Sequence, residues 1–155
     1  MPASAETTAG TPTTVTVGTG ELSITVPAGA TLSTVTPGAN STVTVGTTTV
    51  TDTRAGVAGW SATVALPALT GGARPAEIIP TTTASYLAAT VTPTGTSTLA
   101  APATRTDLAT TPQVSQAASA VSGNNSAAWT GLLTVPIPAQ VLADIYSGVL
   151  TQSVS

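Results

Sequence analysis

The chain contains no cysteine, histidine, lysine or phenylalanine, and its 155 residues include only three arginines and six acidic residues. Without cysteine, neither a disulfide framework nor a thiolate metal site can form. Without histidine, cysteine and lysine, the chain has no ordinary proton shuttle near neutral pH, no thiolate and no amine nucleophile. These absences predict a protein that is not an enzyme and that has no cofactor and no metal site.

Charge is scarce throughout, since charged residues make up 6% of the chain against about 25% in ordinary soluble domains. Nucleic-acid binding and attachment to anionic membranes both depend on clustered Lys and Arg. The chain has only Arg54, Arg74 and Arg105, far apart in the sequence. No apolar run approaches the ~20 residues of a membrane span. The sequence therefore argues against nucleic acid as a partner and against membrane insertion.

What remains is rich in Thr, Ala, Val, Gly, Ser and Pro, and 41% of the residues are apolar. Disorder requires low hydrophobicity as well as unusual charge, so this composition favours folding. Val and Ile alternate with Thr along much of the chain, and β-branched side chains fit a pleated surface. The length suits one domain with a core between two packed layers.

The clearest strand is residues 60–66, where Trp60, Val64 and Leu66 share one face with an intervening alanine. Glycine and proline turns separate it from other alternating segments at intervals of roughly 8–12 residues, which is typical of a sandwich. Ile24 and Tyr146 lie on the apolar faces of two such segments and join the predicted core. The further predicted strands are Glu21–Pro27, Thr42–Asp52 with a bend at Gly46, Glu77–Ile79, Ser85–Val91, Trp129–Val135 and Ile145–Val154.

Two regions lack this regularity. Residues 93–125 are predicted to hold loops, a weak strand near residues 97–100 and a short helix around residues 114–121. Residues 1–19 form a Thr/Ala-rich N-terminal arm with one strand-like stretch, Thr14–Val17, ahead of a β-sandwich domain at residues 20–155.

The most pointed local feature is Asp52-Thr53-Arg54, followed by two glycines and Trp60. We expect Arg54 either to pair with Asp52 or to lie over the ring of Trp60, and Trp60 itself to be a core residue. Trp129, Asn124 and Asn125 are the candidates for surface contact with a partner, and Trp129 could stack on a sugar or a cell-wall polymer.

The acidic residues offer little chemistry. Glycosidases use a pair of carboxylates and usually line their clefts with aromatic residues, but aromatic residues make up 3% of this chain. A calcium site would need clustered oxygen ligands. Asp52, Asp107 and Asp144 are isolated in the sequence, so we expect them to be surface or turn-capping carboxylates.

Several segments, taken in order, resemble the WxL-type surface domain of Gram-positive bacteria, in the version found in exported actinobacterial proteins. The resemblance implies an immunoglobulin-like antiparallel β-sandwich, export, and noncovalent attachment to the cell wall beside partner surface proteins. Residues 129–132, Trp-Thr-Gly-Leu, depart from the Trp-x-Leu motif associated with wall binding, and a second such motif is missing from residues 146–155. The segments that carry the resemblance are Leu22–Pro27, Val50–Arg54, Gly59–Val64, Ile79-Pro80, Gly123–Trp129 and Tyr146–Thr151.

Two hypotheses follow. The first is a non-enzymatic, extracellular protein of the cell surface that binds other protein subunits or a cell-wall polymer. The second is a building block of a larger assembly or homo-oligomer: a capsid-decorating or tail protein in the virion of a phage of a high-GC host, or a self-assembling filament subunit. A start at Met1 without a basic, apolar leader favours the second hypothesis.

Overall fold

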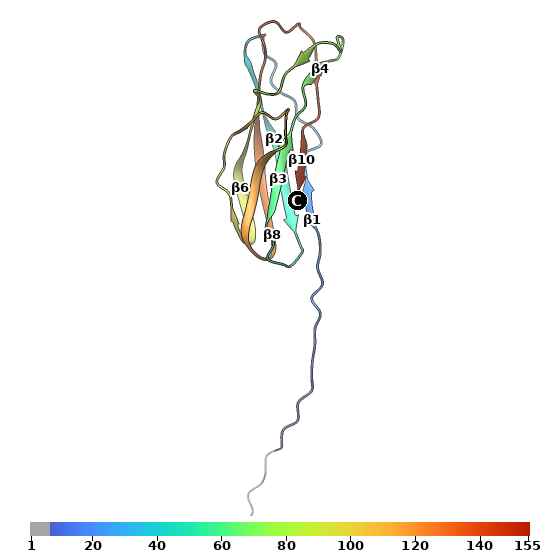
Figure 1. Ribbon diagram of the computed structural model, residues 1–155, viewed down its shortest axis with the longest axis vertical. Coiled ribbons are helices and arrows are strands. Elements are labelled where there is room, and N and C mark those ends of the chain that lie inside the picture. The colour runs from blue at the N-terminus through green and yellow to red at the C-terminus, as the bar shows by residue number, and fades with distance from the viewer. Residues whose placement is uncertain (1–6) are drawn as a thin grey trace, which may run out of the picture.

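The computed structural model describes residues 7–155, which form an antiparallel all-β fold without a helix (Figure 1). This confirms the all-β antiparallel architecture predicted from the alternating pattern. The strands are β1 (Leu22–Thr25), β2 (Asn40–Asp52), β3 (Trp60–Ala65), β4 (Leu69–Gly71), β5 (Ile78–Ile79), β6 (Ser85–Leu99), β7 (Arg105–Thr106), β8 (Gln113–Pro136), β9 (Tyr146–Ser147) and β10 (Thr151–Val154).

The two longest strands, β6 and β8, form an antiparallel ribbon that organises the fold. Their register shifts near the middle, where Gly95 and Gly123 adopt φ values of +72° and +73°. Glycine tolerates this left-handed conformation without steric cost, and such bends let strands pass from one layer of a sandwich to the other. On the opposite side of β8, β2 pairs with residues 125–136 and β3 pairs with residues 113–118.

The bent ribbon therefore contributes to both layers of a barrel-like sandwich. One layer continues from β8 through β2 to β1, and the other continues through β3 to β10. Strand β7 pairs with the start of β6. Strands β1 and β10 end the two layers and lie beside each other without pairing (Figure 1).

Alternation places one face of each main strand in the core. Every second residue is buried from Asn125 to Val135 in β8, and Trp60, Ala62 and Val64 are buried in β3. In β2, Thr48, Val50 and Asp52 are buried beyond a register shift between Val45 and Thr47, so the predicted bend at Gly46 is confirmed.

The largest buried aromatic pair is Trp129 and Tyr86, at 1% and 0% exposure. Tyr86 packs over Gly131, where a Cβ atom would lie 2.3 Å from the tyrosine ring. Glycine at this position of β8 therefore makes room for the ring between the layers. Leu108 is fully buried as well, and its carbonyl accepts a hydrogen bond from the N–H of Leu66.

The helix and most of the loops predicted for residues 93–125 are wrong, and so is the single last strand, whereas the weak strand predicted near residues 97–100 lies within the end of β6. The expected helix at residues 114–121 is part of β8, and most of the expected loops belong to β6 and β8. Small residues such as Ala117 and Ala118 have little preference for strand, but β3 and β6 pair with them from both sides. Strands β9 and β10 divide the predicted strand 145–154, because β9 pairs with β4 in a separate small sheet and β10 pairs with β3.

The described part of the N-terminal arm, residues 7–19, leaves the sandwich as a single extended segment (Figure 1). All of these residues are exposed, and Val15 and Val17 are 87% and 77% exposed. The strand-like stretch Thr14–Val17 pairs with nothing in residues 7–155. The first six residues of the predicted arm lie outside the described residues.

Candidate interaction surface

The turn between β2 and β3 is built around an ion pair. Arg54 donates from Nε to Oδ1 of Asp52 at 2.9 Å and from a terminal nitrogen to Oδ2 at 3.0 Å. The same terminal nitrogen also donates to the carbonyl oxygens of Ala58 and Gly59. Bidentate contacts of this kind are the strong form of a carboxylate–guanidinium pair. Of the two placements expected for Arg54, the structure has the pairing with Asp52.

Asn125 ties this pair to the core. Its Nδ2 donates to Oδ2 of Asp52 at 3.2 Å, and its Oδ1 accepts from the indole Nε1 of Trp60 at 3.0 Å. Asp52, Trp60 and Asn125 are all nearly fully buried. The side-chain hydrogen bonds from Arg54 lower the pKa of Asp52 from its ordinary 3.8 to about 2, although burial opposes the shift. Asp52 is therefore a structural anion that fixes the base of the sandwich.

The N-terminal arm is attached at this same base. The N–H of Gly20 donates to the carbonyl of Thr53 at 2.8 Å, and the N–H of Glu21 donates to the Thr53 hydroxyl at 2.9 Å. A Cβ atom at Gly20 would lie 2.1 Å from that hydroxyl oxygen, so only glycine allows this close approach. Thr53 thus holds the arm where it meets β1, and residues 7–19 beyond that point are all exposed.

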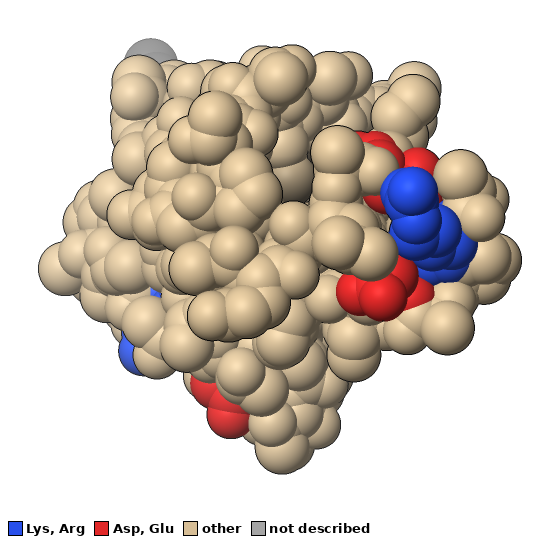
Figure 2. All heavy atoms as spheres, turned by 90° about the horizontal axis from the view of Figure 1, so that it is seen from above, with Lys and Arg blue, Asp and Glu red and all other residues tan. Residues whose placement is uncertain are grey.

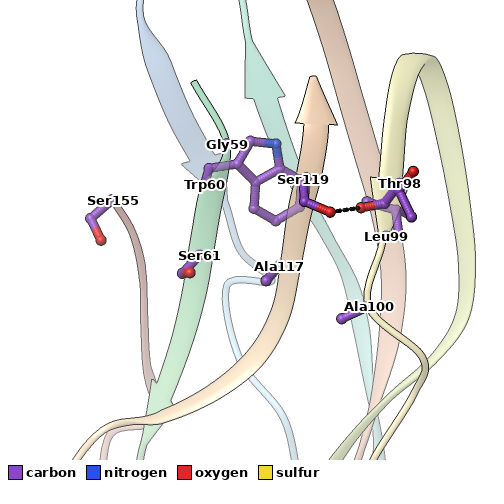
Figure 3. A pocket seen from close by; sticks show the side chains of 10 residues that line it. Gly59, Trp60, Ser61, Thr98, Leu99, Ala100, Ala117, Ser119 and Ser155 are labelled. Carbon is purple, nitrogen blue, oxygen red and sulfur yellow. Dashed lines mark hydrogen bonds between the residues drawn. The ribbon is translucent and has the colours of Figure 1, made fainter. Parts of the chain in front are cut away.

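A shallow groove of about 480 Å³ lies over the β3 side of the sandwich (Figure 3). Trp60, Ser61, Ala117 and Ser119 contribute to its wall, and Ser119 donates a 3.4 Å hydrogen bond to the carbonyl of Thr98. None of the lining side chains is titratable. The side chains of the groove therefore offer hydroxyl and apolar contacts.

The remaining aspartates act in turns. Asp107 accepts hydrogen bonds from the N–H and the hydroxyl of Thr110. Asp144 accepts from the N–H groups of Ala73, Arg74 and Ile145, which together lower its pKa. Among residues 7–155, no group of three or more acidic side chains is placed to hold a metal ion.

Charge is sparse on the end of the molecule that carries β4, β5 and β9. Seen from that end, small groups of red and blue atoms interrupt a face that is otherwise uncharged (Figure 2). In the same region, Arg74 donates to the carbonyl of Ala143, and the Tyr146 hydroxyl donates to the carbonyl of Leu142. These hydrogen bonds hold the loops of this region together, and they do not create a charged patch for binding.

The surface role predicted for two of the three candidate contact residues is wrong. Trp129 is 1% exposed, and its Nε1 donates to the hydroxyl of Tyr86 at 3.1 Å inside the core. Asn125 is buried in the Asp52 network. The alternation of β8 turns both residues inward, and of the three only Asn124 is exposed.

The predicted core residues agree better with the structure than the predicted contact residues do. Trp60, Val64 and Leu66 are buried as expected, whereas Ile24 and Tyr146 are half-buried and pack against the edge of the core. What the sequence did not reveal is the role of Thr53 at the base of the arm and the unpaired edges of β1 and β10. The two glycines that flank Thr19 were the local signal for a change in chain path.

Within the described part of the chain, no helix has the length and hydrophobicity needed to cross a membrane. No protein-family model, no curated protein and no solved structure is significantly similar to this chain.

Proposed function

We propose that this chain is a non-enzymatic structural protein that works as a subunit of a protein assembly displayed on an outer surface. The observation that carries the proposal is the arm at residues 7–19, which extends from the body with every residue exposed. Fully extended, this segment spans roughly 45 Å, which is enough to reach well into a neighbouring molecule.

The chemistry of the arm favours a protein partner. Residues 7–19 carry no charge and alternate Thr with Val at residues 14–17. Such a segment gains most by adding to the edge of a β-sheet, where main-chain hydrogen bonds supply affinity and alternate side chains enter the partner. It has nothing with which to bind phosphate or an anionic surface.

The inventory of functional groups supports a role without catalysis. The groove beside Trp60 has no titratable lining side chain, and Asp52, Asp107 and Asp144 are each engaged in local hydrogen bonds. A catalytic site needs a nucleophile, acid or base free to reach a substrate.

The cell surface is the proposed location, and a virion is the alternative. The resemblance to WxL-type surface domains, with the immunoglobulin-like sandwich and export that it implies, supports the cell surface. The exposed arm fits either location, because strand addition needs only an exposed sheet edge on the partner protein.

Direct binding to a wall polymer is the less favoured form of the proposal. Trp129, the side chain expected to stack on a polymer, is buried and hydrogen-bonded to Tyr86. Incubating the folded protein with purified peptidoglycan tests this form, and retention on the polymer would favour it over attachment through protein subunits.

The main test compares the full chain with a variant that lacks residues 7–19, both produced in the source organism. Residues 7–19 are all exposed, so we expect both forms to show the same thermal unfolding midpoint. The full chain should co-sediment with surface or virion particles, and the variant should remain in the soluble fraction. Equal incorporation of both forms would overturn the proposal.

A further inference from the structure

The outer edge of β10 has unpaired backbone groups at defined positions. Ser61 and Ser155 exchange both of their backbone hydrogen bonds, at 2.8 and 3.0 Å. In an antiparallel pair such residues alternate with residues whose N–H and C=O point away from the partner strand. In β10, the N–H and C=O groups that point away from β3 belong to Gln152 and Val154. These residues lie opposite Val64 and Ala62 of β3.

The outer edge of β1 has the same character. The N–H of Thr53 donates to the carbonyl of Glu21 at 2.9 Å, which sets the phase of pairing between β1 and β2. By the same alternation, the N–H and C=O groups of Leu22 and Ile24 point away from β2. Within residues 7–155, no backbone hydrogen bond joins these groups to β10. Strands β1 and β10 nevertheless contact each other, with Cα atoms closer than 8 Å. We call this unpaired junction of β1 and β10 the seam. Because paired strands lie about 4.8 Å apart, a strand can be added here only if the two edges move apart.

The seam is uncharged and mainly apolar, apart from Gln152, whose side chain is hydrogen-bonded to Thr48 and Tyr86. Leu22, Ile24 and Val154 are half-buried and pack against the core, so part of each side chain remains open. Strands β1 and β10 contain no charged residue and no proline. Those are the devices by which soluble proteins commonly protect the edges of their sheets against pairing.

The edge of β6 in the same sheet does carry such protection. Beyond its pairing with β7, β6 contains Pro93, and its register is broken beside Thr90, which has φ +52°. A proline lacks the N–H that an added strand would use, and bulges twist an edge away from partners. The seam is therefore the edge better suited to accept a strand.

The arm supplies a segment that matches the seam. Thr14–Val17 has the same length as β10, is uncharged, and places Val15 and Val17 on one face. The arm also points away from its own body (Figure 1), and Gly20 is held against Thr53 at its base. The seam that it reaches most directly belongs to another molecule.

We propose that Thr14–Val17 of one copy adds as a strand along the outer edge of β10 in a second copy of this chain. Val15 and Val17 then lie opposite Gln152 and Val154 and turn inward, beside Leu22 and Ile24. This inference rests on the proposed function, in that it names the subunit to which the arm binds. It predicts self-association of the purified chain.

The donor side is tested by adding charge to either face of the arm. The double variant V15E/V17E places two carboxylates in the apolar seam, and T14E/T16E adds the same charge on the opposite face. Each buried valine is worth roughly a tenfold factor or more in affinity. We expect V15E/V17E to weaken self-association at least about a hundredfold in sedimentation velocity, and T14E/T16E to weaken it much less.

The acceptor side is tested by Val154→Pro, which removes an outward N–H without breaking the hydrogen bonds between β10 and β3. The decisive experiment mixes this variant, which can only donate, with the chain lacking residues 7–19, which can only accept. Neither should self-associate alone, and together they should form a 1:1 complex. Matched thermal unfolding midpoints show that both fold.

The possible outcomes separate the two proposals. A mixture that stays monomeric at concentrations where the full chain associates, or a full chain that is monomeric at all concentrations, would overturn strand addition between copies. The proposed function would survive that result if removal of residues 7–19 still abolished incorporation into surface or virion particles. The arm would then bind a different protein.

Discussion

The indole Nε1 of Trp60 donates a 3.0 Å hydrogen bond to Oδ1 of Asn125, a residue 65 positions further along the chain. Trp60 begins β3 in one layer, and Asn125 lies on the part of β8 that belongs to the other layer. The bond therefore crosses the sandwich at its base. Because Asn125 also donates to Asp52, the ion pair with Arg54 holds both layers and the adjoining turn in one arrangement.

Replacement of Asp52 by alanine should destabilise the fold substantially. It leaves Asn125 Nδ2 with one partner fewer and removes the carboxylate that organises Arg54, so hydrogen bonds to a charged group are lost inside the core. We expect a loss of about 2 kcal/mol in the free energy of unfolding. This loss is smaller than for a fully buried ion pair, because the Arg54 side chain is 32% exposed and partly solvated. Urea denaturation measures it.

The matched control for that experiment is Asp107→Ala, which removes a half-buried turn-capping carboxylate bonded to Thr110. Its cost should be about 1 kcal/mol or less, in the range of a lost helix or turn cap. Equal losses for the two variants would mean that the Asp52 network contributes no more than an ordinary turn.

The pH dependence of stability should carry the signature of Asp52. Its pKa is depressed from 3.8 to about 2 in the folded protein, so its contribution is fully present above pH 3.8. That contribution is lost as the pH falls toward 2, because the unfolded chain binds the proton first. The thermal midpoint of the wild-type protein should therefore fall between pH 4 and pH 2, and Asp52→Asn should flatten this dependence. An unchanged slope in the variant would assign the acid sensitivity to other carboxylates, such as Asp144.

The sequence predicted the strands whose alternation is unbroken and failed where bends interrupt it. Strand β3 was predicted within one residue at its end, because Trp60, Ala62 and Val64 follow a strict period of two. In β6 and β8 the left-handed residues Gly95 and Gly123 shift the phase of alternation, so no single period fits either strand. The fold of this ribbon depends on pairing between residues far apart in the chain.

The candidate site was also hard to predict from the sequence, because it too depends on contacts between residues far apart in the chain. The neighbourhood of Asp52 and Arg54 is local, and its ion pair was among the two arrangements expected. The role of Asn125 depends on Asp52 and Trp60, which lie 73 and 65 positions away. Likewise, β1 and β10 have unpaired edges because they are the last strands of their layers. The order of strands in a sheet cannot be predicted from a local sequence pattern.

Packing of Tyr86 over Gly131 makes a sharp prediction for Gly131→Ala. The added Cβ would lie 2.3 Å from the Tyr86 ring, and Tyr86 is hydrogen-bonded to Trp129 and cannot withdraw without breaking that bond. Overpacking of this kind costs about 1–3 kcal/mol, and tryptophan fluorescence should change as Trp129 moves. Gly10→Ala, where nothing lies within 4 Å, is the control and should leave stability unchanged.

The final prediction concerns backbone strain at Thr90, which has φ +52° at the bulge of β6. A β-branched residue in this left-handed region is strained, at a cost on the order of 1 kcal/mol or more. Thr90 is exposed, so replacing it by glycine removes little packing and should raise the free energy of unfolding by about 1 kcal/mol. Thr92→Gly, two residues further along the same exposed strand, should instead lower it by about 1 kcal/mol, since glycine weakens an ordinary strand position. Chemical denaturation of the two variants should therefore give shifts of opposite sign, and destabilisation by both would show that Thr90 is not under strain.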